Sequence, residues 1–142
     1  YAFSEEGAGI DGKSFSLLPV EIFYRETGKT KKVTEYPCDG KLLKAAEQVK
    51  TKYHTGRGVI GSGDEWNNQL DRIALLRERY HTAVEDMESA AAAQLCLSYG
   101  VPFLGVRILS NSIVNGEKFD EAVGIDGQKF MLSLVDQMRE YM

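Results

Sequence analysis

Apolar and polar residues alternate near the start of the chain in the manner of extended strands. Val20, Ile22 and Tyr24 fall on one face at a period of two, and a second extended segment, 32–36, follows a turn around Thr27-Gly28-Lys29. Two alternating segments joined by a short glycine-containing turn are typical of a β-hairpin. The pattern therefore predicts a hairpin between residues 20 and 36.

Longer segments carry the three-to-four residue spacing of amphipathic helices. Asp39 and Asp86 stand where helix N-caps are needed, and Gly100, followed by Pro102, stands where a helix must end. The predicted helices span about Lys41–Lys52, Asn67–Tyr80, Met87–Tyr99 and Asp126–Tyr141.

Short apolar segments lie between these helices. Arg57–Ser62 contains a buried Val-Ile pair, Ala83–Glu85 is short and extended, and Phe103–Leu109 is almost continuously apolar, as expected of a strand covered on both faces. Because strands and helices alternate through the second half, we predict a layered α/β fold.

Composition narrows the class of protein. With 142 residues, the chain has room for one domain. Its 17 basic and 21 acidic residues give a net charge of −4, which argues against nucleic acid as a ligand. No apolar run has the roughly 18 residues of a membrane span. Two cysteines, Cys38 and Cys96, make no disulfide framework and favour reduced thiols in the cytoplasm. The chain begins at Tyr1 without a methionine, so we expect it to be part of a longer protein.

Two features of the sequence could suggest a bound cofactor or metal, but neither has the surroundings that such a site needs. Gly56–Gly61 matches G-x-G-x-x-G, but a helix precedes it and Val59-Ile60 is itself strand-like, whereas a dinucleotide site needs a helix to begin inside the motif. His54 and His81 are far apart and lack companion ligands. We therefore expect neither a cofactor nor a metal.

The loop Gly61–Asn67 is the first candidate site. It follows a buried strand, where ligands collect in α/β proteins, and it carries Trp66, the only tryptophan. An indole here can stack on a flat heterocycle. The alternative is a capped turn whose tryptophan covers the core.

The second candidate is Val84–Ala93, where three carboxylates crowd the start of a helix. The alternative, that they are helix-capping acids, explains Asp86 well. It explains Met87 and Glu88 less well. A carboxylate at this place can accept hydrogen bonds from the vicinal hydroxyls of a ribose, and methionine offers an adaptable apolar floor beneath the sugar.

The third candidate is Val106–Ser112, where an apolar segment turns abruptly polar at Ser110, Asn111 and Ser112. Consecutive hydrogen-bonding side chains at the end of a strand suggest a ligand site. A loop that begins with serine and asparagine is the alternative.

These three segments together resemble the nucleoside phosphorylase superfamily, and most closely the methylthioadenosine/S-adenosylhomocysteine nucleosidases, with the plant bark storage proteins nearby. The likeness rests on 61–66, 84–91 and 100–111. It implies an α/β fold, a three-layer αβα sandwich with a mixed central sheet. Residues 1–142 would then be the C-terminal portion of a single domain, incomplete at the N-terminus, and the whole protein a homodimer that acts on a small purine nucleoside.

The resemblance also implies roles for residues at the sugar and the base. Glu88 matches the carboxylate that binds the ribose 2′- and 3′-hydroxyls, and Met87 the residue beneath the sugar. Trp66 takes the place of an aromatic residue that stacks on the purine. The backbone of Asn67 would hold the edge of the base.

Further along, Ser110 and Asn111 fall where the nucleosidases carry Ser-Asp, whose aspartate assists the departing base at N7, and Arg107 matches a supporting arginine. Asn111 is a departure, because an amide can bond N7 but has no proton to give. A second departure is that the family's opening strands, which hold the water-activating glutamate or the phosphate ligands, are absent.

The resemblance implies a purine nucleosidase. The alternatives are a purine nucleoside phosphorylase, or a nucleoside-binding or storage protein that has lost turnover.

Overall fold

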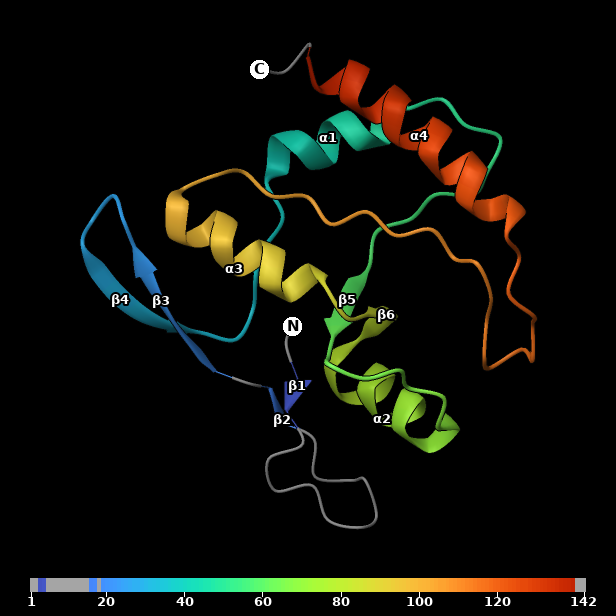
Figure 1. The fold of residues 1–142 in the computed structure, drawn as a ribbon, viewed down its shortest axis with the longest axis horizontal. Helices are drawn as coiled ribbons and strands as arrows, with labels where there is room; N and C mark the ends of the chain where they lie inside the picture. The colour runs from blue at the N-terminus through green and yellow to red at the C-terminus, as the bar shows by residue number, and fades with distance from the viewer. Residues whose placement is uncertain (1–2, 5–15, 18, 140–142) are drawn as a thin grey trace.

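The computed structural model describes residues 3–4, 16–17 and 19–139, in which short strands alternate with helices (Figure 1). In chain order the elements are β1 (Phe3–Ser4), β2 (Ser16–Leu17), β3 (Val20–Tyr24), β4 (Lys29–Val33), α1 (Gly40–Gln48), β5 (Val59–Ser62), α2 (Leu70–Tyr80), β6 (Thr82–Asp86), α3 (Ser89–Tyr99) and α4 (Ala122–Met138).

The predicted α/β class is confirmed, and both kinds of strand pairing are present. Across the described ranges the strands form three two-stranded sheets. β1–β2 and β3–β4 are antiparallel, and β5–β6 is parallel. The strands are thus paired in twos in these residues, with the parallel pair between α2 and α3 (Figure 1).

The predicted hairpin is confirmed as β3–β4. Its turn closes with the N–H of Gly28 donating to the carbonyl of Tyr24 at 2.8 Å, and Gly28 has a φ of +64°, which glycine adopts without strain. Because the turn is tight, β4 begins at Lys29, before the predicted start at Lys32. The Ser98 hydroxyl donates to the Phe23 carbonyl at 2.6 Å and ties the hairpin to α3.

The four predicted helices are present, but α1 ends at Gln48 rather than Lys52 and α2 starts at Leu70 rather than Asn67. Asp39 caps α1, with its carboxylate accepting from the backbone N–H of Lys41 at 2.8 Å and of Leu42 at 3.0 Å. Gly100, with a φ of +67°, ends α3 as predicted. Helix α4 starts at Ala122 rather than Asp126, and its predicted end at Tyr141 lies outside the described residues.

The parallel pair β5–β6 explains the glycine-rich sequence at its start. A Cβ atom at Gly58 would lie 2.5 Å from the Cβ of Ala83, so only glycine allows the two strands to approach this closely. Val59 and Ile60 belong to β5, as the sequence predicted. Of the G-x-G-x-x-G glycines, Gly58 therefore serves strand packing, whereas a Cβ at Gly56 would meet no atom within 4 Å.

The prediction of a strand over Phe103–Leu109 is wrong. This segment crosses between α1–α4 and α3–β5 without forming a hydrogen-bonded ladder (Figure 1). The Phe103 carbonyl accepts from the N–H of Asp39 at 2.7 Å, and a Cβ at Gly105 would lie 2.8 Å from Cδ1 of Ile60. The apolar run predicts a buried strand, but residues 103–106 are half-buried and Leu109 is 68% exposed. A strand also needs a backbone partner in register, and the neighbour of this segment in β5 is the Ile60 side chain.

Helix α1 packs against α4, and α3 packs against both β3 and β5 (Figure 1). Leu134 of α4 is the largest fully buried side chain among the described residues. The buried apolar residues of this part of the chain are Ile22, Ala45, Val49, Leu76, Ala90, Ala93 and Leu134. Within the described residues, none of the helices has the length and apolarity needed to cross a membrane.

Candidate functional site

The candidate site lies at the carboxyl ends of β5 and β6, which are side by side. In this parallel pair, Ser62 is opposite Asp86, so the loops after both strands leave from one edge. The N–H of Gly63 donates to the Asp86 carbonyl at 3.0 Å, which joins the two loops where they begin. Helix α3 starts three residues after β6 ends, so its N-terminus faces the same edge.

Asp86 lies at the centre of a polar cluster at this edge, which also contains Ser62, Ser89 and Arg107. The Asp86 side chain is 7% exposed. Its carboxylate accepts from the Ser89 hydroxyl at 2.5 Å and from the Ser89 N–H at 3.2 Å. It also forms an ion pair with Arg107, through both Nε and Nη2 of the guanidinium. The Ser62 hydroxyl oxygen accepts from the N–H of Ala90 at 3.1 Å and completes the cluster.

These contacts determine the protonation of Asp86. Burial by itself raises the pKa of this carboxyl group, but hydrogen bonds from Ser89 and Ser62 and the charge of Arg107 outweigh burial and hold the pKa of Asp86 below its ordinary value. The carboxylate is therefore charged at neutral pH, and Arg107 is paired with a fixed negative partner.

Arg107 also reaches the acid that follows Met87. Its Nη2 lies 3.9 Å from Oε2 of Glu88, whose side chain is 73% exposed. The same Glu88 oxygen accepts from the N–H of Met87 at 3.3 Å, and Met87 is 45% exposed. A carboxylate and an apolar side chain are thus presented to solvent together at the start of α3, beside a guanidinium held from behind.

The loop after β5 is tied to β6 through Asn67. The amide Nδ2 of Asn67 donates to Oε2 of Glu85 at 2.9 Å, and Glu65 forms an ion pair with Arg72 of α2. Trp66, between these two anchors, is 66% exposed. The alternative in which Trp66 covers the core is wrong, because an indole this exposed covers little of it.

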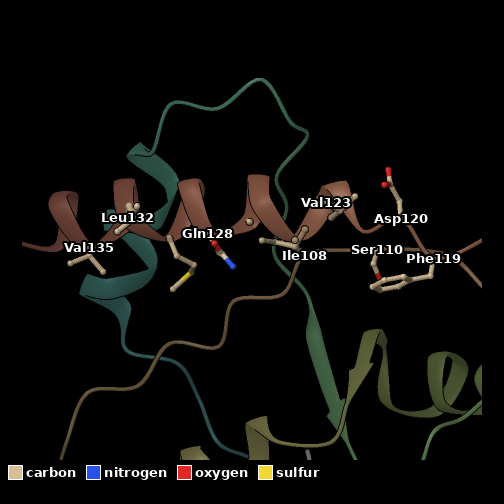
Figure 2. A pocket seen from close by; sticks show the side chains of 11 residues that line it. Ile108, Ser110, Phe119, Asp120, Val123, Gln128, Leu132 and Val135 are labelled. Carbon is tan, nitrogen blue, oxygen red and sulfur yellow. The ribbon is translucent and has the colours of Figure 1, made fainter.

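Ser110 and Asn111 form a separate local arrangement. The Ser110 hydroxyl donates to Oδ1 of Asn111 at 3.1 Å, and the Ser110 carbonyl accepts from the N–H of Asp120 at 3.2 Å. Ser110 also borders a groove of about 640 Å³ between this segment and α4 (Figure 2). Apolar side chains such as Ile108, Phe119 and Leu132 line most of it.

The structure therefore gathers some of the predicted site residues and leaves others apart. Met87, Glu88 and Arg107 lie together, and Asn67 is bonded to β6 just before them. Ser110 and Asn111 bond to each other, and within the described ranges no hydrogen bond or ion pair joins either of them, or Trp66, to Glu88.

Sequence reasoning missed the buried part of this site. It gave Asp86 the role of a helix cap and gave Ser62 and Ser89 no role, although all three belong to the cluster behind Arg107. The available signal was the position of Ser62 and Asp86 at the last residues of two neighbouring strands. Among the residues that the structure describes, no group of three or more metal-ligating side chains comes together.

The carboxylate–guanidinium cluster lies at the carboxyl edge of a parallel strand pair, the place where α/β proteins commonly bind ligands. The sequence profile of the phosphorylase superfamily matches residues 11–138, and the chain belongs to that superfamily. The resemblance stated from the sequence is confirmed.

Several curated proteins are similar to this chain. Proteins called 5′-methylthioadenosine/S-adenosylhomocysteine nucleosidase share 34% identity in Bacillus pumilus (84% of this chain and 56% of the relative), 32% in Aeromonas salmonicida (83% and 54%) and 30% in Geobacillus kaustophilus (74% and 48%). The chain thus spans about half the length of the curated relatives it matches.

Proposed function

We propose that the protein to which this chain belongs is a purine nucleosidase that hydrolyses the N-glycosidic bond of methylthioadenosine, S-adenosylhomocysteine or a close relative. The observation that carries the proposal is the exposed Glu88 carboxylate beside Arg107 at the end of β6, in a chain 34% identical to a protein named for this hydrolysis. The relatives' names favour water over phosphate as the attacking group.

Glu88 and Met87 are assigned to the sugar. The Glu88 side chain is 73% exposed, and a carboxylate has lone pairs to accept hydrogen bonds from the 2′- and 3′-hydroxyls of a ribose. Its negative charge also stabilises the positive charge that develops on the sugar as the glycosidic bond breaks. Met87, exposed one residue earlier, supplies an apolar surface under the ring.

Trp66, Asn67, Ser110 and Asn111 are assigned to the base. Trp66, 66% exposed, is assigned to stacking on the purine, and the Asn67 backbone is assigned to the edge of the ring. Because Oδ1 of Asn111 accepts from Ser110, the Nδ2 group of the amide is the part available to donate to the acceptor nitrogen N7. Asn111 then holds the departing base by a hydrogen bond and gives it no proton.

Four further assignments follow from the same family membership. We propose that residues 1–142 are the C-terminal portion of one larger domain, which other segments complete with the residue that activates water, and that the protein acts in the cytoplasm as a homodimer in methionine salvage. The support is the half-length match, the names of the relatives, and the free thiols of Cys38 and Cys96.

The test uses the protein at its full natural length. Methylthioadenosine, adenosine and inosine are each supplied with and without phosphate, and the release of free base is followed by chromatography. We expect base release without phosphate. Release only with phosphate would identify a phosphorylase, and tight binding of nucleosides without any release would identify a binding or storage protein.

A further inference from the structure

Asp86 is a buried acid to which the proposed reaction gives no direct task. Its side chain is 7% exposed, and it receives hydrogen bonds from Ser89 and an ion pair from Arg107. Its carbonyl is also held, by the N–H of Gly63 at 3.0 Å. Because both the backbone and the side chain of Asp86 are held in place, its carboxylate can fix the position of a neighbouring side chain such as Arg107.

Arg107 lies between this buried acid and the exposed one. Its Nη2, one of the two guanidinium nitrogens that contact the Asp86 carboxylate, also lies 3.9 Å from Oε2 of Glu88. The remaining nitrogens are engaged as well, Nε by Asp86 and Nη1 by the carbonyl of Val106 at 2.8 Å. Arg107 is therefore anchored toward Asp86, with Glu88 at the edge of its reach.

We propose that Asp86 is the positioning residue for the ribose-binding carboxylate: by pairing with Arg107 it holds the guanidinium beside Glu88 without letting it close onto Glu88. This inference rests on the proposed function, because it takes Glu88 to be the group that binds the sugar hydroxyls.

The physical reason is competition for the same oxygens. The hydroxyls of a ribose must bond the Glu88 carboxylate, and an unpaired guanidinium within 3.9 Å would bond it more strongly than a neutral hydroxyl does. Asp86 is the buried partner, so its attraction for Arg107 is less weakened by water than that of the exposed Glu88. Arg107 therefore remains with Asp86. Oε1 of Glu88 is then open to the sugar, and Oε2 is held by the N–H of Met87 at 3.3 Å.

The experiment measures how much the protein gains from the sugar hydroxyls. A purine C-riboside, which has a carbon–carbon glycosidic bond that water does not cleave, and its 2′,3′-dideoxy counterpart are titrated calorimetrically into the full-length protein. The readout is the dissociation constant of the dideoxy compound divided by that of the C-riboside, which measures the gain in affinity from the two hydroxyls. A general loss of stability weakens the binding of both compounds equally and leaves this ratio unchanged. Asp136→Asn is the matched control, since Asp136 is an exposed acid 3.6 Å from Arg139 on α4.

We expect Asp86→Asn to reduce this ratio about tenfold, the size expected for loss of a charge-assisted hydrogen bond, and Asp136→Asn to leave it unchanged. If Asp86→Asn does not fold, Asp86→Glu takes its place, with an expected reduction of about threefold because the charge remains but its reach changes. An unchanged ratio in a folded Asp86 variant, whether or not both compounds bind more weakly, overturns the positioning role of Asp86 and leaves the proposed function standing. Failure of the unmodified protein to bind the C-riboside overturns the proposed function and this inference with it.

Discussion

The hydroxyl oxygen of Ser62, the last residue of β5, accepts a hydrogen bond of 3.1 Å from the backbone N–H of Ala90 in the first turn of α3. The first N–H groups of a helix have no partner within the helix itself. Ser62, 5% exposed, therefore satisfies a buried donor and fixes the N-terminus of α3 on the end of the parallel strand pair. The place of Met87 and Glu88 depends on this contact.

Replacing Ser62 with alanine should destabilise the fold because it leaves the Ala90 N–H buried and unpaired. We expect a loss of about 1–3 kcal/mol in the free energy of unfolding, measured by urea denaturation. Ser133→Ala is the matched control: its exposed hydroxyl donates to the Lys129 carbonyl at 3.2 Å within α4, and its removal should change stability by less than about 0.5 kcal/mol. Equal losses in the two variants would contradict the role of Ser62.

Asp86 should make the stability of the fold sensitive to acid. Its pKa is lower in the folded protein than the value of about 3.9 expected of an unfolded aspartate, so its contribution is complete above about pH 4 and is lost as the pH falls through the folded pKa. In Asp86→Asn, stability at pH 7 should be lower, and the decline below pH 4 should be shallower. Urea midpoints between pH 2.5 and 7 test this, and parallel curves for the two proteins would exclude Asp86 as the source.

Glu88→Ala should separate the sugar from the base. The side chain is exposed, so the thermal midpoint should stay the same. Affinity for a purine riboside should fall about tenfold or more because charge-assisted hydrogen bonds to the hydroxyls are lost, while affinity for free adenine should not change. Calorimetric titration measures both, with the exposed Glu35→Ala as control. A similar loss for adenine would remove Glu88 from the sugar site.

Trp66 is the only tryptophan in the sequence, so its fluorescence reports directly on the loop after β5. Adenine should quench this emission by stacking on the exposed indole. Trp66→Ala should weaken adenine binding by about 1–3 kcal/mol, the usual value of one base stacked on an aromatic ring, and Trp66→Phe should retain most of the affinity. Unchanged fluorescence at saturating adenine would place the base elsewhere.

Asn111→Asp should supply the proton that the amide lacks. If Asn111 faces N7, the rate of base release from 6-aminopurine nucleosides should rise by about 10²–10⁴-fold, the usual size of general acid catalysis. Asn115→Asp in the same loop is the control and should leave the rate unchanged. An equally unchanged rate in Asn111→Asp would remove this residue from the mechanism.

Local patterns in the sequence determined much of this protein. The β3–β4 hairpin, the Asp39 cap, the end of α3 at Gly100 and the strand at Val59–Ser62 each depend on a few neighbouring residues and follow from turn chemistry, capping and periodicity. The motif letters of 61–66, 84–91 and 100–111 together also indicated the family that the profile match confirms.

Only the tertiary structure decided which polar residues share the site and which apolar segment becomes a strand. Asp86 reads as a helix cap along the chain, and its pairing with Arg107 exists because the 103–109 segment folds back past β5 and brings the guanidinium to the end of β6. That same segment satisfies the pattern of a buried strand without becoming one, because strand formation requires a partner backbone in register. Residue spacing predicts neither the pairing of Asp86 with Arg107 nor the contact of Gly105 with Ile60. Each joins residues that are distant in sequence and that only packing brings together.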